Sequence, residues 1–145
     1  MAPTFAPAYV GRGDVWRKKG NYDKALGDYN HAVALESKNS VAFNNRAWLL
    51  ATCPDAKYRD GKVAVESATR ACELSKWKDA RRLDTLAAAC AEAGNFPKAV
   101  EWQEKANTLF TDAESKTRGG ERLKLYQHKR PYRESAVGAN LSRNP

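Results

Sequence analysis

The 145-residue chain lacks several features that mark specialised classes of protein. Its nine glycines and six prolines are too few for a collagen-like or low-complexity chain. No apolar run approaches the roughly 18 residues that a membrane-spanning helix needs. The opening MAPTFAPAY has neither the basic start nor the apolar stretch of a secretory signal. We therefore expect a soluble, cytoplasmic protein that does not associate with membranes.

Groups that could carry catalysis or hold a metal are also scarce. Cys53, Cys72 and Cys90 show no C-x-x-C spacing, which fits neither a zinc ribbon nor a disulfide framework. We expect Cys72 and Cys90 in the core, whereas Cys53 stands in a Thr-Cys-Pro-Asp loop that could expose it to oxidation. His31 and His128 have no evident partner, and neither G-x-x-x-x-G-K nor G-x-S-x-G occurs. The sequence predicts a protein that is not an enzyme and uses no metal or cofactor.

What the chain does contain is an internal repeat. The segment GNYDKALGDYNHAVAL (20–35) returns as GNFPKAVEWQEKANTL (94–109), and GKVAVESATRACEL (61–74) matches its later part. Each copy has two alanines seven residues apart, which places both on one face of a helix and lets a neighbouring helix approach closely. These pairs are Ala25 and Ala32, Ala64 and Ala71, and Ala99 and Ala106.

An apolar stripe with a small residue at its centre precedes each copy. The stripes are Tyr9-Gly13-Trp16, Phe43-Ala47-Leu50 and Leu83-Ala87-Cys90. Their i, i+4, i+7 spacing predicts a further helix in each unit, packed against the helix that comes after it. Gly20 and Gly94 stand where this first helix must end, because glycine tolerates a positive φ. Pro97 stands at the start of a second helix, where its missing N–H costs nothing.

The unit length and the placing of aromatic, glycine and alanine residues resemble the tetratricopeptide repeat, whose period is about 34 residues. The repeats would span about 6–39, 40–77 and 80–111, with extra residues inserted at 52–61 in the middle unit. The inserted unit and the C-terminal KRPYRE are also similar to parts of bacterial repeat proteins. The resemblance implies an all-α domain over 6–110: an α-solenoid of three antiparallel helix pairs in a right-handed superhelix.

Beyond the repeats we expect a capping helix over 112–130 and a flexible basic tail over 131–145. Thr111 to Glu114 matches a capping box, in which a hydroxyl and a carboxylate satisfy the first N–H groups of a helix. Gly119 and Gly120 each weaken this helix by about 1 kcal/mol relative to alanine. Nothing caps the first helix at the other end, so either the module belongs to a longer array or it self-associates through that face.

The resemblance also implies a binding surface, because the first helices of tetratricopeptide repeats line a concave groove that takes peptides. Asn45 is the leading candidate, since an amide offers a peptide backbone both a donor and an acceptor. The alternative for Asn45 is a hydrogen bond to the neighbouring repeat. Trp48 would either anchor a ligand or pack under the 52–61 insertion. By register, the groove residues are Val10, Asp14, Arg17, Asn44, Asn45, Trp48, Arg81, Asp84, Thr85 and Ala88.

The family's carboxylate clamp for chaperone tails is not reproduced in this chain. The clamp positions match Val10, Asp14, Asn45, Arg81 and Thr85. Only Asn45 is kept, Arg81 is a partial substitute, and Asp14 would repel an acidic tail. The resemblance thus argues against EEVD-type tails and predicts a scaffold that binds another protein or peptide segment.

The formal charge of +8 supports an alternative partner. Residues 114–145 hold eight basic and three acidic side chains, with Tyr126 and Tyr132 among them. Such a segment could contact nucleic-acid phosphates and stack on bases, or lie on an acidic protein surface. A solvated capping helix explains the same residues, so nucleic acid is the alternative to groove binding.

Overall fold

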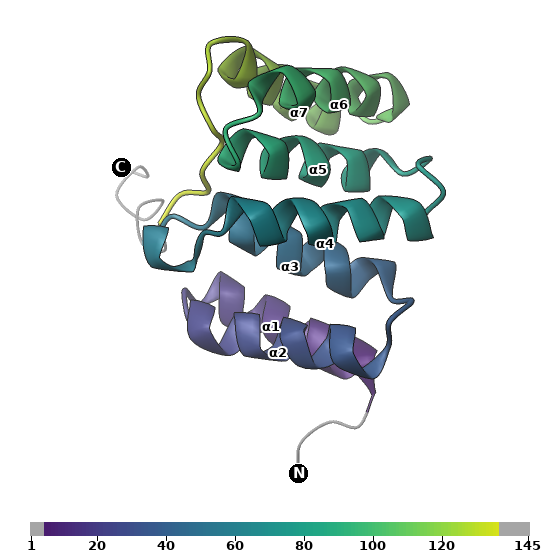
Figure 1. The fold of residues 1–145 in the computed structure, drawn as a ribbon, viewed down its shortest axis with the longest axis vertical. Coiled ribbons are helices and arrows are strands. Elements are labelled where there is room, and N and C mark those ends of the chain that lie inside the picture. The colour runs from purple at the N-terminus through teal and green to yellow at the C-terminus, as the bar shows by residue number, and fades with distance from the viewer. Residues whose placement is uncertain (1–4, 137–145) are drawn as a thin grey trace.

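The computed structural model describes residues 5–136, which form seven α-helices and one short 3-10 helix. Figure 1 shows the helices stacked in chain order along the long axis of the molecule. The prediction of an all-α stack of three helix pairs with a final capping helix is confirmed. The elements are α1 (Ala6–Lys18), α2 (Tyr22–Leu35), α3 (Ser40–Thr52), η1 (Ala56–Tyr58), α4 (Gly61–Leu74), α5 (Ala80–Glu92), α6 (Phe96–Leu109) and α7 (Ala113–Gln127).

Most helices begin at an Asn or Asp side chain that accepts a hydrogen bond from the backbone N–H three residues on. Such a cap satisfies one of the N–H groups that the first turn leaves unpaired. In α7 the capping residue is Asp112, so the predicted capping box starting at Thr111 is wrong. Glu114 pairs instead with Arg118, one turn further along the same helix. The other caps of this kind are Asn21, Asn39, Asp60, Asp79 and Asn95.

Four helices end on a residue with positive φ at the same place. Gly20 and Gly94 follow α1 and α5 with φ of 79° and 84°, as the sequence predicts. Lys76 and Lys129 hold the equivalent places after α4 and α7, with φ of 58° and 57°. At each end two N–H groups return to carbonyls of the last turn, which is the Schellman arrangement. Two lysines thus adopt a conformation that glycine adopts more readily.

The core of the stack consists largely of the repeat alanines. All six are fully buried, as expected where helices approach closely. Larger side chains fill the space between them, and Tyr126 of α7 packs into the main cluster together with Leu83 and Phe110. The capping helix thus covers the apolar face of the last repeat. The six alanines are Ala25, Ala32, Ala64, Ala71, Ala99 and Ala106.

The insertion in the middle unit folds over the end of α3. It contains η1 and returns to α3 through a hydrogen bond from the Asp60 N–H to the Leu50 carbonyl, 2.9 Å long. Arg59 donates to the carbonyl oxygen of Cys53 at 2.7 Å. Cys53 is only 2% exposed. The exposure that the Thr-Cys-Pro-Asp loop made possible at Cys53 does not occur, because Cys53 is buried.

α1 packs mainly against α2 and α3. Phe5 and Val15 at this end are 61% and 49% exposed. Self-association through this face stays a prediction. Within residues 5–136, no helix combines the length and the apolar character needed to cross a bilayer.

After α7 the chain turns back along the stack. Figure 1 shows this segment, in yellow, descending from α7 past α5 to the level of α3. Arg133 pairs with Glu92 at the end of α5, and the Glu134 N–H donates to the carbonyl oxygen of Thr52 at 2.8 Å. This differs from a flexible tail that starts at residue 131. Residues 137–145 of the predicted tail lie outside the described residues.

Candidate functional site

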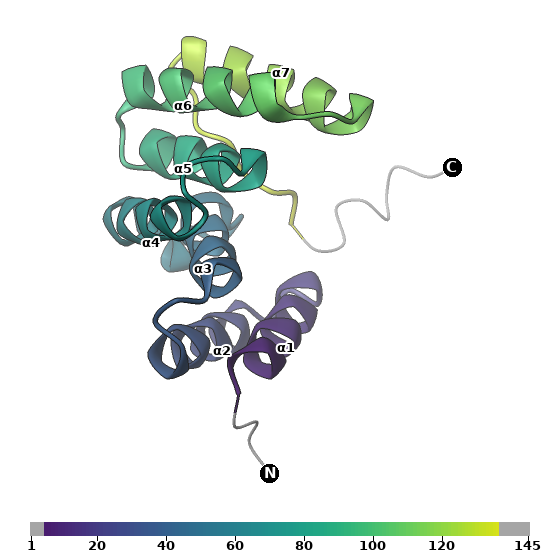
Figure 2. The ribbon, with the colours of Figure 1, turned by 90° about the vertical axis from the view of Figure 1, so that its right-hand side faces the viewer.

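The first helices of the three pairs line a cleft of about 340 Å³. Figure 2 shows α1 and α7 at the two ends of this face, with the C-terminal segment running between them. Val10 and Ala88 are buried, and neither they nor Asp14 line the cleft. Seven of the predicted residues do line it: Arg17, Asn44, Asn45, Trp48, Arg81, Asp84 and Thr85. The lining is completed by Phe110, Ser115, Arg118, Arg122, Tyr132 and Glu134.

Asn45 is engaged with the neighbouring repeat. Its Nδ2 donates to Asp14 Oδ1 at 3.1 Å, and its Oδ1 accepts from Asn44 Nδ2 at 3.2 Å. Asp14 Oδ1 also accepts from the Tyr29 hydroxyl at 2.6 Å. Burial, and next the Asp14 carboxylate, raise the pKa of Tyr29, so its hydroxyl remains a donor. Of the two alternatives for Asn45, the structure contains the hydrogen bond between repeats.

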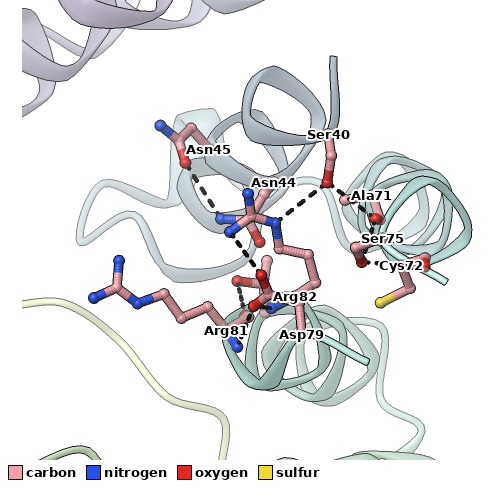
Figure 3. A network of polar contacts seen from close by, with 10 residues as sticks. Ser40, Asn44, Asn45, Ala71, Cys72, Ser75, Asp79, Arg81 and Arg82 are labelled. Carbon is pink, nitrogen blue, oxygen red and sulfur yellow. Dashed lines mark hydrogen bonds and ion pairs between the residues drawn. The ribbon is translucent and has the colours of Figure 1, made fainter. Parts of the chain in front are cut away.

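A second polar network fixes the middle and last repeats behind these asparagines (Figure 3). Arg82 Nε of α5 donates to Ser40 Oγ of α3 at 3.2 Å, and Ser40 Oγ donates to the Ala71 carbonyl of α4 at 3.1 Å. Figure 3 shows Arg81 extending away from this network. Arg81 is exposed and lines the cleft.

Asp84 joins three helices. Its Oδ1 accepts from Gln103 Nε2 of α6 at 2.8 Å and from Arg122 Nε of α7 at 3.0 Å. Burial raises the pKa of Asp84, while Arg122 and Gln103 favour the carboxylate form and oppose that rise. The neighbouring Thr85 hydroxyl donates to the Arg81 carbonyl within its own helix. Asp84 thus holds the last repeat and its cap together, whereas the Thr85 hydroxyl is bonded within α5.

Trp48 lies beneath the C-terminal segment. Its ring centroid is 5.7 Å from that of Tyr132, and the Arg122 guanidinium lies over both rings. The indole Nε1 donates to Glu134 Oε1 at 2.6 Å. Arg17 Nη1 of α1 donates to both oxygens of the same carboxylate, at 3.1 and 3.2 Å. Trp48 therefore packs under Tyr132 and Glu134 and not, as predicted, under the insertion.

Sequence reasoning missed the contribution of Arg122, Tyr132 and Glu134. A signal for them was present: Pro131 favours an extended backbone, and an aromatic and an acidic residue follow it in an otherwise basic stretch. A flexible tail has no need of a proline followed by an aromatic and an acidic residue, so this pattern indicates a segment that packs on the protein. The arginines of the cleft outnumber its carboxylates. Its lining includes two carboxylates, Asp84 and Glu134, and four arginines, Arg17, Arg81, Arg118 and Arg122.

The histidines and the buried cysteines are engaged in contacts within the protein. His31 stacks on Tyr9, and the Nδ1 atoms of His31 and His128 lie 2.9 and 2.7 Å from carbonyls of their own helices. Burial raises the pKa of Cys72 to about 12 and that of Cys90 to about 11, so both thiols stay protonated. Among residues 5–136, no three His, Cys, Asp or Glu side chains are grouped to hold a metal ion.

Comparison with known proteins identifies the repeat. The family model described as tetratricopeptide repeat matches residues 6–39. None of the curated proteins matches the sequence significantly. The first TPR domain of the human RPAP3 protein shares the fold with a TM-score of 0.72 and 19% identity, over 88% of this chain and 94% of that one. The N-terminal domain of stress-induced protein-1 (STI-1) from C. elegans gives a TM-score of 0.59 and 21% identity, over 80% and 92%.

The two kinds of similarity agree. The family match covers α1 and α2, and the likeness in fold extends the same pairwise packing through the later helices. The buried alanine pairs and the helix lengths recur in both units that the sequence match does not reach, and the turn glycine recurs in the third unit as Gly94. The first helix pair therefore matches the tetratricopeptide repeat in sequence, and the helices from Ala6 to Gln127 share the fold of tetratricopeptide repeat domains, with three helix pairs and a capping helix.

Proposed function

We propose that the chain is a non-catalytic scaffold that binds an extended peptide or protein segment in the cleft lined by α1, α3 and α5. Domains of this repeat family generally mediate interactions between proteins. The observation that carries the proposal is the lining of the cleft, where half-buried Trp48 lies among a surplus of arginines. Aromatic and arginine side chains contribute most of the binding energy at protein interfaces.

The ligand we propose is not a chaperone tail of the EEVD type. Asp14 stands where such a clamp needs a donor, and its carboxylate already accepts from Tyr29 and Asn45. A second carboxylate at that place would be repelled. Asn45 is the one amide of that clamp retained here, and both ends of its side chain are used within the protein.

Nucleic-acid binding through the basic C-terminal region receives less support. Arg118, Arg122 and Arg133 each form an ion pair with a carboxylate of the chain. Their charges are partly neutralised, and phosphate contacts would have to replace these pairs. Nucleic acid therefore remains an alternative outcome of the binding experiment.

The proposal is tested by selecting peptides from a displayed library on the full chain after nuclease treatment. We then compare the affinity of the selected peptides for Arg81→Glu and for Lys62→Glu. Both variants reverse an exposed positive charge, but Lys62 lies on α4 and does not line the cleft. We expect a loss of about tenfold or more for Arg81→Glu alone, because an interface charge would be reversed. Equal losses in both variants, or a library that yields no binder, would contradict the proposal.

A further inference from the structure

We propose that residues Tyr132–Glu134 act as an internal competitor in the cleft, and that the partner which replaces them is a peptide of the same pattern. That partner carries an aromatic side chain followed two positions later by a carboxylate. The inference rests on the proposed function and names the chemistry of its ligand. It starts from the finding that part of the cleft is already filled by an extended segment of the chain itself.

The segment lies in the cleft as an extended peptide would. Tyr132 and Glu134 face the cleft, where they meet Trp48, while Arg133 between them pairs with Glu92. This alternation is that of an extended strand, whose successive side chains point to opposite sides. One backbone hydrogen bond, from the Glu134 N–H to Thr52, accompanies the side-chain contacts.

The cleft is built for a carboxylate at this point. Glu134 accepts from the Trp48 indole and from Arg17, two donors that belong to different repeats. If Glu134 left without replacement, a half-buried guanidinium and an indole N–H would lose their acceptor, which costs free energy. A ligand carboxylate restores both contacts, and a ligand ring restores the stacking on Trp48.

Release of the segment does not require the repeats to open. α7 is anchored before the segment begins, through buried Tyr126 and through the pair of Arg122 with Asp84. The Schellman arrangement, in which the Lys129 and Arg130 N–H groups return to Tyr126 and Leu125, closes the end of the helix before the segment begins. Residues 131–134 are only half-buried. The segment is therefore an arm that can be exchanged on an intact array.

The internal position of the segment explains why a few contacts suffice to hold it. Only residues 128–131 separate the end of α7 from Tyr132. A tether this short gives an effective concentration on the order of millimolar, so a weak ligand fills its site when linked. An external peptide competes with that local concentration, and its apparent affinity falls accordingly.

An adjoining cavity of about 580 Å³, lined in part by Arg118 and Glu121, leaves room for a longer partner beside the segment.

The test uses a labelled octapeptide, Lys-Arg-Pro-Tyr-Arg-Glu-Ser-Ala, which copies residues 129–136. Its affinity is measured by fluorescence anisotropy for the full wild-type chain and for the full chain carrying Tyr132→Ala with Glu134→Gln. We expect the double variant to bind the peptide about tenfold more tightly or better, because its internal competitor is weakened. The matched control, Arg130→Ala with Ser135→Ala, changes two exposed residues on either side of Tyr132–Glu134 and should bind like the wild type.

Peptide variants test the pattern. Replacing the tyrosine by alanine, or the glutamate by glutamine, should each weaken binding to the double variant about tenfold or more. Equal affinity of the wild type and the double variant would overturn internal competition. Equal affinity of the three peptides would overturn the proposed ligand pattern. If the octapeptide fails to bind while library-selected peptides bind, this inference falls and the proposed function stands; if neither binds, both fall.

A measurement on the wild-type chain keeps the test independent of variant folding. The Glu134 N–H is hydrogen-bonded to Thr52, so its hydrogen exchange is slowed while the segment is bound. Saturating octapeptide should speed this exchange and leave the amides of α3 and α5 protected. Unchanged exchange at Glu134 with peptide bound would show that the peptide binds elsewhere, which overturns the proposal.

Discussion

The indole of Trp48 and the carboxylate of Glu134, 86 positions apart in the chain, are joined by a 2.6 Å hydrogen bond. The bond links the first helix of the middle repeat to the segment beyond the capping helix. Arg17 adds α1 to the same contact. Three parts of the chain that share no local sequence signal thus meet at one carboxylate.

The charge of that carboxylate should contribute measurably to stability. Glu134→Gln keeps an acceptor for Trp48 but removes the ion pair with Arg17, whose side chain is 24% exposed. We expect the free energy of unfolding in urea to fall by about 1 kcal/mol, because the pair is partly shielded from water. The matched change Glu114→Gln affects the exposed pair with Arg118 and should cost no more than about 0.5 kcal/mol. Equal losses would mean that Glu134 acts as an ordinary surface residue.

The two glycines of the capping helix should respond in opposite ways to alanine. A Cβ on Gly119 would lie 2.1 Å from Asn107 Oδ1, and moving that side chain breaks its bond to Gln103. Gly120 has nothing within 4 Å of a Cβ. We expect Gly119→Ala to lower the free energy of unfolding by about 1 kcal/mol. Gly120→Ala should raise it by about the same amount, through helix propensity. Thermal melts of both variants test this. A change in melting temperature of the same sign in both would contradict the close approach of Gly119 to Asn107.

The positive φ of Lys76 should cost stability that glycine recovers. Lys76→Gly relieves a left-handed backbone at the end of α4, and we expect a gain of about 0.5 to 1 kcal/mol. The reverse change, Gly94→Ala, places a side chain at φ of 84° with nothing within 4 Å of the new Cβ. It should cost about 1 kcal/mol through backbone strain alone. Urea midpoints measure both, and a loss on Lys76→Gly would contradict the assigned conformation.

The buried thiols should make the protein less stable at alkaline pH. In the folded chain burial raises the pKa of Cys72 to about 12 and that of Cys90 to about 11, whereas unfolded thiols ionise near pH 8.5. Above that pH the folded state holds more protons than the unfolded state, so the free energy of unfolding falls as the pH rises towards 11. Urea titrations at pH 8 and pH 10 should show this fall, and Cys72→Ala with Cys90→Ala should reduce it. An unchanged fall in that double variant would assign it to other groups.

The sequence was sufficient for the repeated elements because their signals are local. Spacings of three, four and seven residues predicted the paired helices, and single glycines predicted where α1 and α5 end. The alanine pairs indicated which helix faces meet. Each of these features depends on residues within about two turns of one another, and periodicity reports that range.

The cleft was predictable only in outline. Register placed Asn45, Trp48 and Asp84 on the correct helices, but their partners come from other repeats and from the region after α7. Whether Asn45 is free depends on how closely α1 approaches α3. Whether Trp48 is open depends on the path of a segment that has no periodicity. The burial of Cys53 was missed for the same reason, since a loop without a repeating pattern covers it.

The contact between Arg17 and Glu134 spans 117 positions of the chain. A stack of repeats ordinarily behaves as a row of neighbours, in which either end can fray while the rest stays folded. Here the first helix is tied to the segment that comes after the last, and the row becomes a closed loop. Fraying of α1 and release of the segment are thereby coupled, because each removes the ion-pair partner of the other.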